Sequence, residues 1–443
     1  MTQGYYAGIS GLQTNQYGLD VIADNLANTS TTGYKGSTTE FADLLSQTIN
    51  SASPTFDDVG SGARIQATSY QMDQGTLTPS DRFSDLALDG NGWFGVEQKG
   101  STYFTRDGHF VFDTTEKSAG DANSSVSRLT TVDGMYVLGT NLSNYSYDAA
   151  YDYGDTTSNN TSGAYVISNS TSQVNLGTAG DQTLLELPTR LAYPVEPTTT
   201  MQFTGNLGTD DATRTISGDA ISGNDALNRV TLTFTKSAVQ PTEGVAWDVV
   251  ATVTSKDGNT VYDTQNGQAT FNASGILSSF DIASLDNDGS TVNLDLAGKL
   301  GGVVSVDGLA ISGASSADGM RGGILNGYAI DSDGIIVADF SNGRQSAIGR
   351  VAVYHFQNDQ GLNRDGGTYF TESSDSGKPV FWTDASGNTI TGATVNSNYL
   401  EASNVRPEVA LTDMIVTQRA YQASAKTITT VDEMIQKALQ MHK

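Results

Sequence analysis

Apolar side chains recur at helical spacing at both ends of the chain, and this feature constrains the fold more than any other. From about residue 408 to 440 they alternate in steps of three and four, a heptad pattern with apolar a and d positions. From Tyr5 to Leu26 they follow steps of three, four and seven, which place them on one side of a helix. We therefore predict two amphipathic terminal helices with a seam between them. The residues expected in that seam are Ile9, Leu12, Leu19, Ile22, Leu26, Leu411, Met414, Tyr421, Ala425, Ile428, Ile435 and Leu439.

Local signals place the ends of these helices. The Asn28 side chain and the Thr-Ser-Thr-Thr-Gly run after it break the first helix. Pro407 suits the first turn of the second helix, because its missing N–H would be unpaired there anyway. That helix would be about 45 to 50 Å long at 1.5 Å per residue, too long for a small β domain to bury.

Two arrangements of the terminal helices are open. Each apolar stripe could pack on a globular domain of its own, or the helices could pack with each other and with copies of themselves. Gln16, Gln418 and Asp432 interrupt the stripes. Because polar interruptions weaken an isolated helix pair, we expect the second arrangement to be ordered mainly when many copies assemble.

The ends of the chain are nearly uncharged, whereas its middle is strongly acidic. Residues 1–30 carry only Asp20 and Asp24, and residues 404–443 carry five bases against four acids, while the whole chain has a formal net charge of −26. The middle is therefore the solvated surface, and the ends are available for packing. The length of 443 residues favours about three domains on a prior of about 150 residues each.

Strand signals dominate the middle. Runs of β-branched or aromatic residues occur at 230–234, 247–254 and 351–356. Asp-Gly or Asn-Gly pairs at 107–108, 133–134, 257–258, 333–334 and 342–343 supply the positive φ angles that hairpins need. This pattern predicts a mainly β protein with two or more antiparallel β domains.

The composition argues against several kinds of chemistry. The chain has no Cys, so it has no thiolate nucleophile, disulfide framework or Cys-ligated metal. His109, His355 and His442 fall in separate predicted elements, which argues against a metal cluster or a Ser/His/Asp arrangement. Acidic turns at 286–289 and 331–334 resemble parts of calcium loops, but we expect hairpin turns there. We predict no catalytic, cofactor-binding or metal-binding residues, and therefore no enzyme.

The acidic charge and the hydropathy also limit the partners. Few Lys and Arg residues are present to neutralise phosphates, so we expect no nucleic-acid partner. No stretch reaches the roughly 18 to 20 apolar residues of a membrane span, so we expect no membrane insertion. The first residues lack a basic segment followed by an apolar one. We therefore expect either a cytoplasmic protein or export without cleavage of a signal peptide.

Both termini carry specific sequence matches. Residues 24–35, with the sequence DNLANTSTTGYK, resemble the N-terminal signature of the bacterial flagellar axial proteins, the rod and hook family. Residues 401–426, with EASNV at the start and QRAYQASAK at the end, resemble its C-terminal partner. The signature positions carried over are Asn25, Asn28, Gly33, Tyr34, Lys35, Asn404, Gln418, Arg419, Tyr421 and Gln422.

The resemblance implies nested, discontinuous domains. The chain is expected to run outward through helical, inner β and outer β domains and then to return. Blocks at 89–94 and 103–110 resemble the inner β domain of rods and hooks, and residues 187–207 resemble the start of the outer domain of hooks. The expected domains are a terminal helical assembly domain (1–30 with 404–443), a connector (31–71), an inner β domain (72–144 with 320–403) and an outer β domain (145–319).

The resemblance also implies a structural role. We expect a hook subunit that assembles into a curved tube and transmits torque, outside the cell. The implied partners are copies of the chain, the flagellar rod, the hook cap, the hook-filament junction proteins and the flagellar type III export apparatus. One alternative is a distal rod subunit, although rod members usually lack an outer domain. A second is a secreted carbohydrate-active β protein, suggested by Trp93, Trp247 and Trp382 among many acids.

Overall fold

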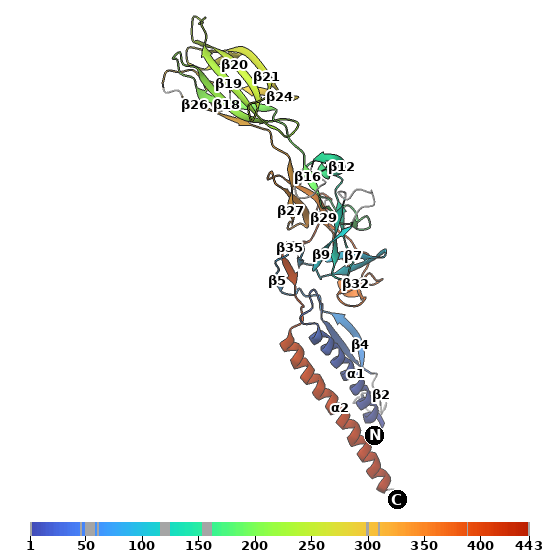
Figure 1. Cartoon of the computed structure of the whole chain (residues 1–443). Helices are drawn as coiled ribbons and strands as arrows, with labels where there is room; N and C mark the ends of the chain where they lie inside the picture. Colours follow the sequence, from blue (N-terminus) through green and yellow to red (C-terminus); the bar gives the residue numbers. More distant parts are fainter. Residues whose placement is uncertain are drawn as a thin grey trace.

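The computed structural model describes residues 2–44, 47–48, 58–59, 62–115, 125–152, 162–297, 301–308, 311–387 and 389–441. The molecule is elongated, with both termini at one end and a β domain at the other (Figure 1). The chain runs from the N-terminal helix through the inner strands to the far β domain and returns to the C-terminal helix. The fold is therefore mainly β, nested and discontinuous, as the sequence predicts.

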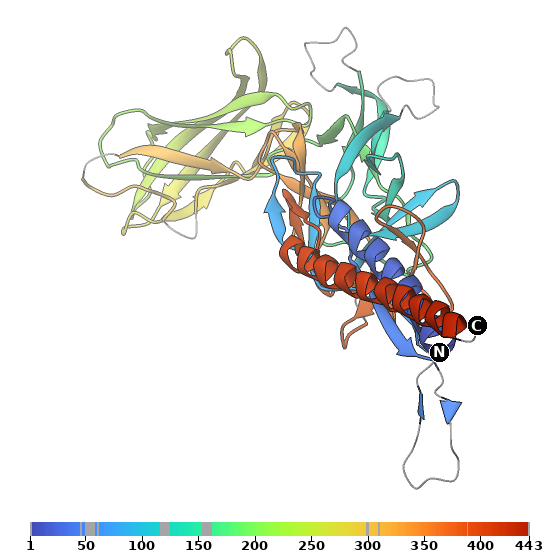
Figure 2. The same cartoon turned by 90° about the horizontal axis from the view of Figure 1, so that it is seen from below.

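Two helices form the end of the molecule that holds the termini. Helix α1 spans Thr2–Ala27 and helix α2 spans Pro407–Met441, and they lie side by side and antiparallel (Figures 1 and 2). Pro407 is the first residue of α2, as predicted. α1 ends before Asn28, whose amide N–H donates to the Asp24 carbonyl. We call α1 and α2 together the helical unit.

A two-stranded ribbon lies along α1. It consists of β1 (Ser37–Asp43) and β4 (Ala63–Tyr70), which pair antiparallel with a register shift after Glu40. The Tyr17 and Thr68 hydroxyls are 3.3 Å apart, and the Ala63 N–H donates to Ser10 Oγ at 3.3 Å. Two short strands, β2 (Gln47–Thr48) and β3 (Asp58–Val59), pair beyond this ribbon.

The inner β domain is built on a 16-stranded sheet in the described part of the chain. The strands of this sheet are β7 (Trp93–Gln98), β8 (Ser101–Thr105), β9 (Phe110–Thr115), β10 (Val126–Thr131), β11 (Tyr136–Asn141), β12 (Tyr145–Asp152), β13 (Ser162–Ile167), β14 (Thr183–Leu184), β15 (Glu186–Pro188), β16 (Leu191–Tyr193), β27 (Gly323–Ile330), β28 (Ile335–Phe340), β29 (Gln345–Val351), β30 (Val353–Tyr354), β31 (Asn363–Arg364) and β32 (Tyr369–Thr371).

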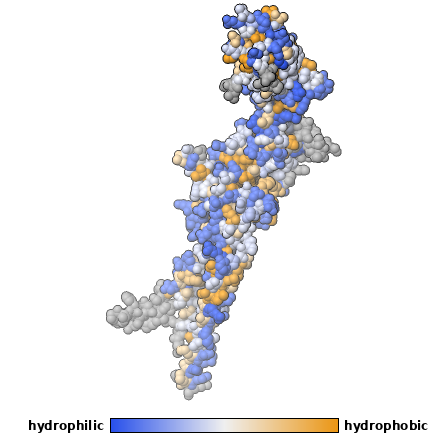
Figure 3. Space-filling model, turned by 90° about the vertical axis from the view of Figure 1, so that its left-hand side faces the viewer, coloured by the Kyte–Doolittle hydropathy of each residue, from blue (hydrophilic) through white to orange (hydrophobic). Residues whose placement is uncertain are grey.

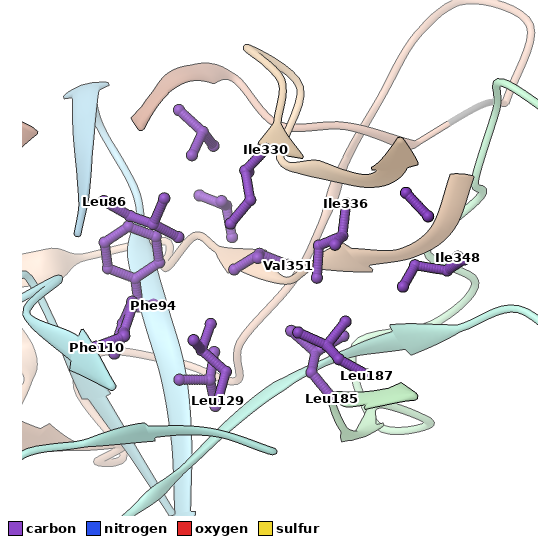
Figure 4. Packing of buried hydrophobic residues seen from close by; sticks show 14 of the residues in the cluster. Leu86, Phe94, Phe110, Leu129, Leu185, Leu187, Ile330, Ile336, Ile348 and Val351 are labelled. Carbon is purple, nitrogen blue, oxygen red and sulfur yellow. The ribbon is translucent and has the colours of Figure 1, made fainter. Parts of the chain in front are cut away.

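Shorter strand pairs complete the inner domain. They are β5 (Leu77–Pro79) with β36 (Tyr399–Glu401), β6 (Leu86–Gly90) with β35 (Ala393–Ser397), and β33 (Trp382–Thr383) with β34 (Thr389–Ile390), and a 3-10 turn η2 (Asp359–Gly361) follows β30. The β5–β36 and β6–β35 pairs join the outgoing and returning halves of the chain next to the helical unit. Figure 4 shows the core beneath the sheet, in which Phe94 and Phe110 from the first half pack near Ile330 and Val351 from the second.

The outer β domain has two sheets over a separate core. The antiparallel sheet contains β18 (Arg214–Ile221), β19 (Leu227–Lys236), β20 (Val245–Ser255), β21 (Val261–Phe271) and β22 (Leu277–Phe280). The mixed sheet contains β17 (Thr200–Asn206), β23 (Ser284–Asn287), β24 (Ser290–Asp295), β25 (Val303–Val304) and β26 (Ile311–Ala317). The buried indole of Trp247 donates to Ser305 Oγ at 3.1 Å across this core.

The boundary between the two β domains differs from the predicted one. The prediction began the outer domain at residue 145, whereas strands β12 to β16 belong to the inner sheet, and Tyr165 and Leu191 pack in the same core as Leu86. The chain instead crosses between the domains where Glu196 and Met320 form an antiparallel bridge. Tyr145 and Tyr147, which alternate along β12, both pack against the ring of Tyr165.

Most predicted turn glycines adopt the expected conformation. Gly134, Gly258, Gly334 and Gly343 have φ angles of 81°, 76°, 76° and 78°. Gly108 serves a different purpose, because a Cβ atom there would lie 1.7 Å from the Leu86 carbonyl oxygen. The predicted turns at 286–289 and 331–334 connect β23 with β24 and β27 with β28.

Candidate assembly site

The seam between the helices is lined by small residues from α1. A Cβ atom on Gly8 would lie 2.7 Å from Ile428 Cγ1, and one on Gly11 would lie 2.9 Å from Ser424 Oγ. Gly4 faces Val431, and Gly18 faces Thr417. Glycines at steps of three, four and seven therefore let the two helix backbones approach closely.

The opposite side of the seam is a heptad of half-buried positions on α2. Its hydroxyls bond within the helix, because Thr417 Oγ1 donates to the Asp413 carbonyl at 2.8 Å and Ser424 Oγ donates to the Ala420 carbonyl at 3.0 Å. With its hydroxyl satisfied in this way, a Thr or Ser packs like a small apolar residue. The α2 residues in the seam are Ala410, Met414, Thr417, Tyr421, Ser424, Ile428, Val431, Ile435 and Ala438.

The predicted α2 seam consists of two heptad rows, and one of these rows is displaced by one residue from the row that the structure places in the seam. Met414, Tyr421, Ala425, Ile428 and Ile435 are half-buried, as a seam requires. Leu411 and Leu439 are instead 47% and 67% exposed, and Gln418 and Asp432 are exposed with them. The reason is that the true seam uses the neighbouring positions 410, 417, 424, 431 and 438, most of which carry residues too small to stand out in a pattern of large apolar side chains.

On α1, the predicted stripe lies beside the seam. Ile9, Leu12, Leu19, Ile22 and Leu26 are all half-buried, while the glycines make the closest approaches to α2. Spacing of apolar residues identified the helix but not the side that faces α2. The repeated Gly4, Gly8, Gly11 and Gly18 were the available signal for that side.

Five of the signature residues meet where the helical unit joins the inner β domain, and we call this region the junction. The Asn25 amide pairs with the Ser37 backbone, accepting from its N–H at 2.9 Å and donating to its carbonyl at 2.7 Å. The Asn404 amide accepts from the Gly36 N–H at 2.8 Å and donates to the Gln71 carbonyl at 2.7 Å. The residues at the junction are Asn25, Gly33, Tyr34, Lys35 and Asn404.

Three charged side chains are buried together in the junction. Lys35 Nζ donates to Glu401 Oε1 at 2.7 Å, and Arg106 Nη1 donates to Glu401 Oε2 at 3.2 Å. The carbonyls of Asp73 and Gly90 accept further bonds from Lys35 and Arg106, at 2.8 and 2.7 Å. Burial lowers the pKa of both Lys35 and Arg106, and the Glu401 carboxylate opposes this shift. One carboxylate thus ties together the N-terminal segment, the inner sheet and the returning chain.

Gly33 and Tyr34 fit tightly beside this ion cluster. Gly33 has a φ of 66°, and a Cβ atom there would lie 2.4 Å from the Asp107 backbone nitrogen. The Tyr34 hydroxyl donates to Asp24 Oδ2 at 2.8 Å, and burial raises its pKa. The Arg364 guanidinium lies 4.6 Å from the centre of the Tyr34 ring and donates to the Lys35 carbonyl.

The other signature residues lie elsewhere. Asn28 stays at the end of α1, where its amide donates to the Asp24 carbonyl at 2.9 Å. Gln418, Arg419 and Gln422 are exposed on α2, away from the seam, and Arg419 donates to Gln422 Oε1 at 3.2 Å. Tyr421 belongs to the seam. Sequence reasoning did not select Glu401, Arg106 or Arg364, although Glu401 opens the C-terminal signature.

The helical unit leaves apolar surface uncovered. Ala410 is the only buried residue of α2 among those described, and Ile415, Val416 and Met434 are more than half exposed. Figure 3 shows hydrophobic side chains at the surface of the inner β domain and the adjoining part of the helical unit. Within the described residues, no helix is both long and apolar enough to span a membrane, and no three His, Asp or Glu side chains are placed to share a metal ion.

Known proteins match the chain at both ends and along its length. A family model described as "Flagella basal body rod protein" matches residues 6–35, and one described as "Flagellar basal body rod FlgEFG protein C-terminal" matches residues 396–441. The flagellar hook protein FlgE of Borreliella burgdorferi is 29% identical over 487 residues, covering 100% of both chains. FlgE of Salmonella typhimurium is 26% identical over 443 residues, covering 96% of this chain and 97% of that protein.

A solved structure is also similar. The crystal structure of the Helicobacter pylori flagellar hook protein FlgE2 aligns with a TM-score of 0.44 and 17% identity, covering 73% of this chain and 100% of that chain. The two family models cover the seam residues of both helices except Gly4, and they cover the junction signatures; the FlgE relatives extend through the outer β domain as well.

Proposed function

The chain belongs to the flagellar hook protein family, and on this premise we propose that it polymerises with copies of itself into the hook, a curved helical tube. The tube acts as a universal joint that transmits torque from the rod to the filament. The observation that carries the proposal is the helical unit, whose apolar side chains are left exposed by the described part of the chain.

The mechanism is mechanical. In this proposal the segments 1–30 and 404–443 form the assembly domain, and packing of long helices from many subunits makes the tube wall stiff along its axis. The outer β domains, which are acidic, meet through smaller and wetter contacts that slide as the hook turns. The seam residues supply the packing between helices. The signature residues at the junction hold the helical unit on the inner β domain.

Membership of this family associates the chain with the flagellum, and its individual partners are part of the proposal. We place the subunit outside the cell, in contact with the rod, the hook cap and the hook-filament junction proteins. The flagellar type III apparatus exports the unfolded chain without cleaving a signal peptide. The lack of Cys suits this route, because an exposed reactive thiol would be a hazard for a secreted polymer.

Two rivals fit the observations less well. A distal rod subunit has no use for the outer domain, whereas relatives named as hook proteins align through it. A carbohydrate-binding protein would need exposed aromatic side chains, yet Trp93 and Trp247 are buried, and only Trp382 of the three is exposed. Trp382 stacks on His355, with ring centres 4.0 Å apart.

A point substitution in the seam tests the proposal. Ile428→Asp places a carboxylate against Gly8, so we expect the purified chain to lose the ability to form tubes while its β domains stay folded. The matched control is Thr429→Asp, which adds the same charge at the neighbouring exposed position and should leave tubes intact. Negative-stain electron microscopy scores the tubes, and near-UV circular dichroism reports the β domains. Curved tubes from Ile428→Asp would contradict the role of the seam.

A further inference from the structure

A second apolar stripe runs along α2, apart from the seam. Its residues fall in two neighbouring rows with heptad spacing, one through 409, 416 and 423 and one through 420, 434 and 441, which keeps them on one side of a helix. Val416 is 63% exposed, Met434 is 52% exposed and Met441 is 83% exposed. We call this the outer stripe of α2. Its apolar members are Val409, Val416, Ala420, Ala423, Met434 and Met441, and the same two rows also hold Asp413, Thr427, Thr430 and Lys437.

The outer stripe continues past the end of α1. Gly4 faces Val431 across the seam, so α1, which begins at Thr2, ends near that level. The ten residues of α2 after Val431 extend about 15 Å further at 1.5 Å per residue. Figure 1 shows the C-terminal end of α2 beyond the N-terminus. Met434 and Met441 therefore have no described part of their own chain to cover them.

The third side of α2 differs from both apolar sides. It carries Thr412, Arg419, Lys426 and Glu433 at steps of seven, all of them exposed. Charged side chains of both signs are expected to stay solvated there. α2 therefore has one side for α1, one side for water and, in the outer stripe, a mainly apolar side that the described part of its own chain leaves exposed.

α1 offers a complementary surface that its own chain does not use. Its glycine side faces α2, and its Ser10 and Tyr17 side faces the β1–β4 ribbon. The remaining side is apolar except for the exposed Gln16, carries no charge, and is half-buried or exposed along its length. We call it the free stripe of α1, and it comprises Tyr5, Ile9, Leu12, Leu19, Ala23 and Leu26.

We propose that the outer stripe of α2 docks on the free stripe of α1 in a second copy of the chain. This inference rests on the proposed homopolymer and names the surfaces that join its subunits. Each copy carries one stripe of each kind, on different helices, so the contact is heterologous and passes from subunit to subunit. Such a contact extends into a helical polymer when the rotation between subunits does not close a ring, whereas pairing of two identical stripes would close a dimer.

Engineered cysteines test this contact in the full-length protein, which has no Cys of its own. Each α2 variant (Val409→Cys, Val416→Cys, Ala423→Cys or Met434→Cys) is mixed with Ile9→Cys or Ala23→Cys, polymerised and oxidised. We expect at least one mixture to shift on a non-reducing gel to twice the chain mass. Gln422→Cys, on an exposed position of α2 outside the outer stripe, is the matched control and should give no such band.

A double variant then tests the direction of assembly. Gly18 faces Thr417, so Ile9 and Val416 of one chain are about ten residues, or roughly 15 Å, apart along the helices, too far for a disulfide within the chain. We expect Ile9→Cys with Val416→Cys, or with whichever α2 position reacts, to give a ladder of covalent multimers.

Other outcomes overturn the inference. Tubes without a crosslink in any mixture would reject these surfaces and leave the proposed function standing. A doubled mass from the Val416→Cys chain alone would indicate pairing of identical stripes, against the inference. Failure of the unmodified chain to form tubes would overturn the proposed function, and the inference with it.

Discussion

Glu401 is the residue on which the junction depends most. Its two carboxylate oxygens contact Lys35 and Arg106, and Oε1 also accepts from the Gly75 N–H at 2.9 Å. All three charged side chains are almost wholly buried, so solvent cannot replace a lost partner. Two cations share a single anion here, and removal of the carboxylate charge leaves both uncompensated.

Glu401→Gln is therefore expected to destabilise the junction by about 3 to 5 kcal/mol, the usual cost of breaking a buried pair by removing one partner. The measurement is the free energy of unfolding in urea. Glu196→Gln is the matched control, because the side chains of the Arg344–Glu196 pair are 43% and 39% exposed, and solvent screening should keep the cost below about 1 kcal/mol. Equal effects of the two substitutions would show that burial of the triad adds nothing to stability.

At the scale of elements, the antiparallel helix pair depends on close backbone approach. Gly8 leaves room for Ile428, and the hydroxyls of Thr417 and Ser424 turn back onto their own helix. The closest contacts between α1 and α2 are therefore made by glycines of α1, which have low helix propensity, and not by good helix formers. A glycine within a helix costs about 1 kcal/mol relative to alanine, and the seam uses that space for packing.

The substitution Gly8→Val distinguishes the effect of packing in the seam from the effect of intrinsic helix propensity. Valine favours a helix more than glycine does, so an isolated α1 would gain a few tenths of a kcal/mol. In the seam the new side chain collides with Ile428, and we expect a net loss of about 1 to 3 kcal/mol from overpacking. The readout is the thermal loss of helical circular dichroism together with tube formation. Gln13→Val, at an exposed position of α1, should preserve both, and a stable, tube-forming Gly8→Val would refute close packing at this site.

At the scale of the whole molecule, two separate cores divide the β structure. The inner core takes residues from both halves of the chain, whereas the outer core lies wholly within residues 201–303. The crossing between them is held by the Glu196–Met320 bridge and by exposed ion pairs, Arg344 with Glu196 and Arg321 with Asp225. The outer domain has the features of an independently folding unit whose ends lie side by side.

The fragment 195–321 is accordingly expected to unfold in urea in one cooperative transition, reported by Trp247, the only tryptophan within it. The fragment 145–319 is the comparison. It carries β12, β13 and β16 without their inner-sheet partner β27 or the rest of that core, so we expect it to aggregate or to bind a hydrophobic dye. The boundary predicted at 145 would be restored if the 145–319 fragment were soluble and unfolded cooperatively while the 195–321 fragment showed no unfolding transition.

Sequence by itself determined the features that short-range physics controls. Helical spacing and Pro407 located both terminal helices, and Asp-Gly and Asn-Gly pairs located hairpin turns such as those at Gly258 and Gly343, because spacing, caps and φ preferences act within a few residues. The resemblance of the ends to a known family added five residues that meet at one junction, from Asn25 to Asn404.

Only the tertiary structure decided which side of each helix is the seam, where the β domains divide, and which carboxylate Lys35 meets. Glu401 is 366 residues from Lys35, and no local pattern encodes that distance. The seam side of α2 depends on the row of glycines that α1 presents to it, since α2 has two apolar sides of its own. Strands from 145 to 193 look the same in sequence whichever sheet they join, because strand propensity is local and strand pairing is not.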